Sequence, residues 1–192
     1  YMYRCYRIPA RPFWNHRQTA STFGGTALAL GGLVYGVLNV PYLAIIGDDY
    51  TALLSSLAVV IVAGLAVEGV GLKRHAKDLN KAENEGAVSH YVQSTTFGKS
   101  YLLRNVLIAI NIVAVLALGA AAINGWLGLT LWGLVTVSVL GSALIGRAIF
   151  YVLVVPTTMP GAFFWKNKAF EEHAREIGLA ANPAVGVATW KH

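Results

Sequence analysis

Four long apolar runs, separated by two short polar links and one longer polar stretch, dominate the pattern of this chain. They cover Thr22–Ile46, Thr51–Leu72, Tyr101–Ile123 and Leu127–Val155. Each run is at least as long as the ~20 residues that an α-helix needs to span the hydrocarbon of a bilayer. The pattern predicts an all-α, polytopic membrane helix bundle with four transmembrane helices over residues 22–155.

The polar segments divide the rest of the chain. Residues 1–21 are predicted to be a cytoplasmic connector, and residues 73–100 a cytoplasmic loop between the second and third spans. Residues 156–192 are predicted to be a cytoplasmic or interfacial tail, in which 162–179 mixes aromatic and charged residues as an interfacial helix does. The composition, 56% hydrophobic and 12% charged, leaves too little polar surface for a soluble protein of 192 residues.

Positive charge lies on one side of the predicted bundle. Fourteen of the fifteen Lys and Arg residues fall in or beside the connector, the long loop and the tail, whereas the links Gly47–Tyr50 and Asn124–Trp126 contain none. Because Lys and Arg collect in cytoplasmic loops, both chain ends are predicted to be cytoplasmic. This asymmetry also accounts for the net charge of +6, so membrane lipid is predicted as a partner and nucleic acid is not.

Three charged residues are predicted to enter the membrane near its cytoplasmic face. Glu68 and Arg147 lie ~26 Å and ~30 Å from the outer starts of their helices, and Arg104 enters at a similar level. We expect Glu68 to pair with an arginine, and this cluster, with Asn111 and Tyr151, is a candidate quinone pocket or proton path. An interhelical ion pair that only fixes packing explains the same pattern equally well.

Several cofactor sites are not expected in this chain. All five histidines are predicted to lie in cytoplasmic loops or tails, whereas a haem in a helical bundle needs imidazoles within the spans. Cys5 is the only cysteine, which excludes an iron–sulfur cluster or a Cys-rich zinc site held by this chain alone. No catalytic residue and no metal ligand is predicted, so the chain does not look like an enzyme by itself.

Two segments resemble the membrane-anchor subunits of dimethyl sulfoxide reductase-type molybdoenzymes, within the polysulfide-reductase-like group. Ala10-Arg11-Pro12-Phe13-Trp14-Asn15 looks like the connector between the two halves of such anchors. Gly146-Arg147-Ala148-Ile149-Phe150-Tyr151 is similar to the Gly-Arg-x-x-Phe-Tyr pattern of their final helix. Some relatives have Glu four residues before that arginine, where this chain has Ala143.

The resemblance implies an eight-span anchor of which this chain is the C-terminal half, with the quinol-binding histidine in the other half. Such an anchor exchanges electrons between quinone or quinol and a four-cluster iron–sulfur subunit, which serves a molybdopterin catalytic subunit. The cofactor implied is therefore quinone, bound mainly by the other half, in the inner membrane of a prokaryote. Candidates for partner docking are Arg11, Trp14, Asn15 and Trp165.

The basic loops bear on which relative this chain resembles. Anchors that serve exported enzymes dock their partners outside, whereas here the connector and tail are predicted inside, which favours a cytoplasm-facing enzyme such as a sulfite-oxidising complex. A half-bundle of a transporter is the main alternative, although a transporter usually has its ionisable group near the bilayer midplane. A structural scaffold of a larger respiratory assembly is the third hypothesis.

Overall fold

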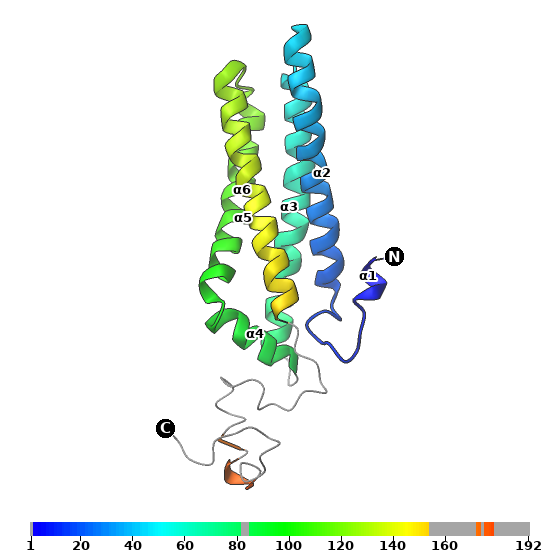
Figure 1. Ribbon diagram of the computed structural model, residues 1–192, viewed down its shortest axis with the longest axis vertical. Helices are drawn as coiled ribbons and strands as arrows, with labels where there is room; N and C mark the ends of the chain where they lie inside the picture. The colour runs from blue at the N-terminus through cyan, green and yellow to red at the C-terminus, as the bar shows by residue number, and fades with distance from the viewer. Residues whose placement is uncertain (1, 82–84, 154–171, 174, 179–192) are drawn as a thin grey trace.

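The computed structural model describes residues 2–81, 85–153, 172–173 and 175–178, and all its regular structure is helical. Four long helices stand side by side in an elongated bundle, and two shorter ones lie at one end (Figure 1). The helices, in chain order, are α1 Met2–Cys5, α2 Arg17–Ile46, α3 Thr51–Asn80, α4 Glu85–Thr95, α5 Gly98–Ala121 and α6 Gly125–Val152.

The four long helices confirm the predicted spans, since each is long and apolar enough to cross a membrane. Large apolar side chains face outward along them, for example Leu38, which is 70% exposed, and Ile45, which is 84% exposed. Outward apolar surface of this extent suits lipid and not water. The chain therefore has the build of a multi-pass membrane protein.

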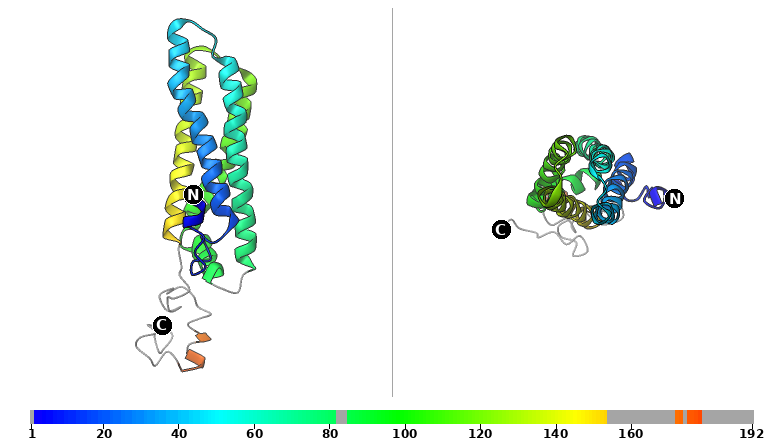
Figure 2. Two further views of the ribbon diagram at one scale, coloured as in Figure 1. Left: turned by 90° about the vertical axis from the view of Figure 1, so that its right-hand side faces the viewer. Right: turned by 90° about the horizontal axis from the view of Figure 1, so that it is seen from above.

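Viewed along the bundle, the helices form a ring in the order α2, α3, α5, α6 (Figure 2). Successive members pack along one another, while α6 meets α2 less extensively. The links α2–α3 and α5–α6 lie at one end, called here the acidic end after Asp48 and Asp49 in the first link. The connector and α4 lie at the other, called the basic end (Figures 1 and 2).

The α2–α3 pair makes the most extensive contact in the ring. A Cβ atom added to Gly25 would lie 2.5 Å from the carbonyl oxygen of Gly64, and one added to Gly64 would lie 2.6 Å from that of Gly25. Two helices approach so closely only where both backbones lack side chains. Gly32 and Gly36 of α2 also pack on α3, where an added Cβ would lie 3.0 Å from the Ile61 side chain and 3.2 Å from the Leu57 side chain, respectively.

The helices extend further at the basic end than the apolar runs predicted. α2 begins five residues before Thr22, and α3 continues to Asn80, eight residues past Leu72. Basic residues are good helix formers, so a helix continues beyond the hydrocarbon once water can solvate them. The predicted loop over 73–100 is consequently largely helical, comprising the end of α3 and the helix α4. The predicted tail, residues 156–192, lies mostly outside the described residues.

Buried side chains form two apolar clusters. The larger follows the middle and the acidic end of the bundle and includes Leu33, Ile61 and Val139. The smaller, called here the aromatic cap, closes the basic end and consists of Phe13, Trp14, Leu79, Ile149, Phe150 and Leu153.

Candidate functional site

A layer of buried polar residues lies toward the basic end of the bundle and is the candidate site. Burying polar groups costs free energy unless they are hydrogen-bonded, so a concentration of them inside a membrane bundle calls for a reason. The layer draws on four helices, α2 to α5. We define this polar layer as Gln18, Thr19, Thr22, Thr26, Glu68, His75, Ser89, Gln93 and Arg104, all of which are at most 7% exposed.

Glu68 on α3 is the carboxylate of this layer. Its side chain is 4% exposed, and the Thr26 hydroxyl donates a hydrogen bond of 3.2 Å to Oε2. The facing residue on α6 is Gly146, where an added Cβ would lie 3.7 Å from Glu68 Oε1. At that distance a methyl group would be in ordinary van der Waals contact with the carboxylate.

The prediction that Glu68 forms an ion pair with an arginine is wrong. Within the described part of the chain, no Lys or Arg nitrogen lies within 4.0 Å of its oxygens. The Arg104 guanidinium instead donates from Nε and Nη2 to Asn105 Oδ1, at 3.2 and 2.9 Å, and lies 5.1 Å from the centre of the Tyr101 ring. The Arg104 side chain approaches the same glycine, Gly146, within 3.4 Å of an added Cβ, so Arg104 shares the layer with Glu68 without an ion pair between them.

Arg147 belongs to the aromatic surroundings and not to the polar layer. Its guanidinium carbon lies 3.8 Å from the centre of the Phe23 ring, a cation–π contact, and its buried Nη1 has no hydrogen-bond partner among the described residues. Because α-helical residues are about 100° apart around the axis, Gly146 faces the layer while Arg147 turns toward α2. The three predicted charges thus share one end of the bundle but not one cluster.

A cavity of about 10 Å³ lies inside the layer, bordered by Glu68, Arg104, Gln18, Gln93 and His75. A quinone ring needs a pocket of several hundred Å³, whereas a space of this size suits a single water molecule. Two acceptors beside it, Gln18 Oε1 and Gln93 Oε1, are buried and have no hydrogen-bond partner among the described residues. The cavity is therefore the size of one water molecule, and it lies beside a carboxyl group that can bind and release a proton.

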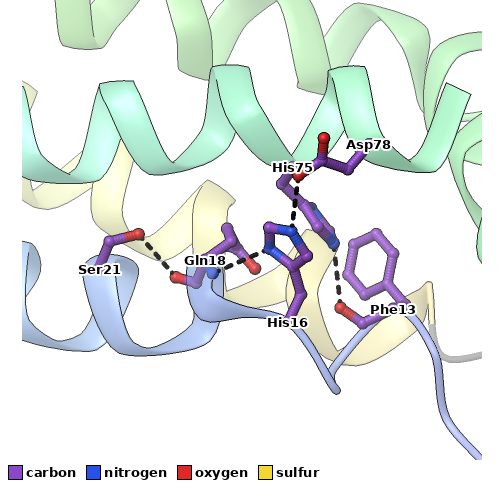
Figure 3. A network of polar contacts seen from close by, with 6 residues as sticks. All are labelled: Phe13, His16, Gln18, Ser21, His75 and Asp78. Atoms are coloured by element: carbon purple, nitrogen blue, oxygen red, sulfur yellow. Dashed lines mark hydrogen bonds and ion pairs between the residues drawn. The ribbon is translucent and has the colours of Figure 1, made fainter. Parts of the chain in front are cut away.

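Histidines join the connector to α3 at the edge of the layer (Figure 3). His16 precedes α2 and accepts the Gln18 backbone N–H at Nδ1, 3.0 Å, so its Nε2 carries the hydrogen that is donated to Asp78 Oδ2 at 3.0 Å. His75 Nε2 donates to the Phe13 carbonyl at 3.1 Å, and the two imidazole rings lie 4.8 Å apart. The prediction that His75 lies in a loop is wrong, since it is 3% exposed within α3.

The two remaining pocket candidates lie apart from the layer. Asn111 on α5 accepts a 2.7 Å hydrogen bond from the Ser138 hydroxyl of α6, which makes it an interhelical contact between two spans. The Tyr151 hydroxyl is 2.9 Å from that of Tyr6 in the connector, and its side chain is 52% exposed. Neither residue contributes to the cavity beside Glu68.

The docking candidates have mainly internal contacts. Trp14 is 9% exposed, donates from Nε1 to the Phe150 carbonyl at 2.9 Å, and stacks on the Phe150 ring. Arg11 lies 4.8 Å from the centre of the Trp14 ring, and Asn15 accepts a 3.0 Å hydrogen bond from Arg7 Nε. Trp165 lies outside the described residues. Of the described three, Trp14 is too enclosed to anchor a partner in this conformation.

Several residues of the layer were not predicted, although the sequence carries a signal for them. Gln18, Thr22 and Thr26 follow one another at intervals of four residues, which puts them on one face of α2. Gln18 Nε2 donates to the Thr22 hydroxyl within this stripe at 2.6 Å. Among the described residues no group of three His, Cys, Asp or Glu is placed to hold a metal ion.

Comparisons of the whole chain with protein-family models, with curated proteins and with solved structures find no match.

Proposed function

We propose that this chain is the membrane-anchor portion of a quinone-linked molybdoenzyme complex, and that Glu68 is the group through which it exchanges protons. The observation that carries the proposal is the contact between the two segments of family resemblance. Trp14, from the connector segment, donates its indole hydrogen bond to Phe150, from the final-helix segment, 136 residues away. Motifs so far apart in sequence that meet in one structure are more specific than either motif alone.

Glu68 supports the protonic part of the proposal. It is a buried carboxyl group with one hydroxyl partner, beside a cavity of single-water size and two unpartnered carbonyl oxygens. Reduction of a quinone consumes protons and oxidation of a quinol releases them, so a quinone-linked anchor needs a carrier of this kind near one membrane face. The small cavity favours proton transfer over head-group binding, and quinone is then held chiefly by the other half of the anchor.

The basic end is the side proposed to face the other subunits. Electrons pass between the quinone pool and a four-cluster iron–sulfur subunit docked there, which relays them to a molybdopterin catalytic subunit. The exposed cations of the connector, together with α4, offer a polar surface outside the membrane for this docking. Because basic loops favour the cytoplasmic side, the proposed enzyme faces the cytoplasm, as one that oxidises sulfite would.

Composition of the native assembly tests this proposal. The chain is to be isolated with its partners in mild detergent, and the subunit masses, molybdenum, iron and extractable quinone measured per copy. We expect stoichiometric molybdenum and iron with two larger soluble subunits. A metal-free assembly of this chain alone would contradict the proposal and leave the transporter and scaffold hypotheses. Flux assays in vesicles would distinguish these two.

A further inference from the structure

We propose that the crevice between α2 and α3 at the basic end binds one anionic phospholipid, with the phosphate at Arg17 and Arg74. The crevice measures about 530 Å³. Its polar lining includes His16, Arg17, Arg74 and Asp78, and its apolar lining Ala66, Val67 and Val70. This inference is independent of the electron-transfer proposal, because it concerns the lipid around the chain and not its partners.

Charge complementarity identifies the head group. Arg17 and Arg74 are both exposed, and neither side chain has an ion pair, hydrogen bond or ring contact with another described residue. Asp78 is the acidic residue of the lining, but the His16 imidazole donates to its Oδ2 at 3.0 Å. Two unpartnered guanidinium groups at one crevice match the oxygens of a phosphodiester, which arginine binds with paired hydrogen bonds.

The lining of the crevice is charged at one end and apolar at the other, as a phospholipid is. Ala66, Val70, Arg74 and Asp78 recur every four residues and share one face of α3, with the apolar pair nearer the middle of the membrane. Arg74 is eight residues, ~12 Å, beyond Ala66 along this face. Val67 and Val70 are 45% and 51% exposed, so an acyl chain can lie against them. A soluble anion would use the arginines but not this wall.

The two helices hold this geometry firmly. Gly71 lies against α2, where an added Cβ would be 3.9 Å from the Gln18 Cα and would collide with the Ser21 hydroxyl oxygen. Ser21 itself donates to the Gln18 carbonyl at 2.9 Å, which fixes its side chain on α2 (Figure 3). The floor of the crevice is therefore a close helix contact, and Arg17 and Arg74 stand on either side of it.

Native mass spectrometry of the protein as it purifies, with its partners, tests the site. The delipidated assembly is titrated with phosphatidylglycerol, with phosphatidylcholine and with inorganic phosphate. Each basic residue near a membrane surface contributes about five-fold to binding of anionic lipid, so Arg17→Gln with Arg74→Gln should weaken phosphatidylglycerol binding about 30-fold. Arg17→Lys with Arg74→Lys, which retains the charge but loses the paired hydrogen bonds of the guanidinium groups, should weaken binding less than the double Gln variant does.

The matched control removes two positive charges elsewhere at the same end, by Arg4→Gln with Lys99→Gln, and should leave the affinity within about two-fold, since neither residue lines the crevice. Thermal unfolding in detergent verifies that each variant is folded. The proposal is overturned if the unaltered protein does not prefer phosphatidylglycerol to phosphatidylcholine, or if the control weakens binding as much as the crevice variant. Displacement of the lipid by excess inorganic phosphate overturns it too, because the apolar wall would then contribute nothing.

Discussion

The two ends of the bundle are built from the same helices but are filled differently. Toward the acidic end the buried side chains are almost all apolar, as at Leu33, Leu54 and Trp132. Toward the basic end they include a carboxylate, a guanidinium, an imidazole and two amides, closed off by the aromatic cap. Lipid and helix packing alone account for the first arrangement.

The second arrangement costs more than packing requires. A buried ion with no oppositely charged group in contact is expensive, and replacing such groups with apolar side chains commonly stabilises a protein. At the acidic end, by contrast, charge stays outside: Asp49 accepts hydrogen bonds from the Thr51 backbone and hydroxyl, and these lower the pKa of its exposed carboxyl. This difference between the two ends supports the proposal that the polar layer exchanges protons.

The largest effect on stability is expected where the polar layer meets the apolar core. Gly25→Ala would place a methyl group 2.5 Å from the Gly64 carbonyl oxygen and 2.9 Å from the Glu68 nitrogen, so α2 and α3 must separate. Overpacking of this kind costs about 1–3 kcal/mol. The change in the free energy of unfolding is measured by titrating the purified chain, in a mild detergent, with dodecyl sulfate and following the helix content by circular dichroism.

The neighbouring residue supplies the control for that experiment. A Cβ atom at Gly24 has nothing within 4 Å, so Gly24→Ala should be neutral or stabilise the helix by up to about 1 kcal/mol. Equal losses at the two positions would show that the helix contact is not what the variant disrupts.

A smaller effect is expected at the aromatic cap. Trp14→Phe retains an aromatic ring but removes the indole N–H, leaving the Phe150 carbonyl without its 2.9 Å donor. The expected cost is about 1 kcal/mol in the same titration. Trp126→Phe is the control and should change stability by less than about 0.5 kcal/mol, because Trp126 is 86% exposed. If the control costs as much as the cap variant, the cap does not secure the connector.

The smallest effect is expected at the polar pair between α5 and α6. Ser138→Ala removes the 2.7 Å hydrogen bond to Asn111, and such bonds between membrane helices contribute about 0.6 kcal/mol. Ser56→Ala, which removes a bond from Ser56 only to its own helix, is the matched control. Equal losses at Ser138 and Ser56 would contradict a stabilising role for the contact with Asn111.

Much of the fold was predictable because hydropathy and the placement of Lys and Arg are strong signals. Spans, their order and the common end of Glu68, Arg104 and Arg147 follow from run lengths and the helical rise. The ion pair could not be predicted in the same way, since depth says nothing of direction around the helix axis. Gly146 faces Glu68, and Arg147, the next residue, therefore points to Phe23.

His75 escaped prediction for another reason. Its neighbours in the sequence are Lys73, Arg74 and Lys77, and such a basic stretch is typical of a solvated loop. It is buried because the connector returns across α3, so that Phe13 accepts its hydrogen bond and packs against its ring. That contact joins residues 62 positions apart, and local pattern carries no information about it.

Replacement of Glu68 in the intact complex tests whether this carboxyl group exchanges the protons. Glu68→Gln retains an acceptor for Thr26 but cannot release a proton, whereas Thr26→Val removes the hydrogen bond and leaves the carboxyl group. Quinone-linked turnover is measured while a pH indicator follows proton exchange. We expect both rates to fall about 100-fold in Glu68→Gln and to stay within about ten-fold of the unaltered complex in Thr26→Val. Turnover and proton exchange at the unaltered rate in the folded Glu68→Gln complex would contradict the account.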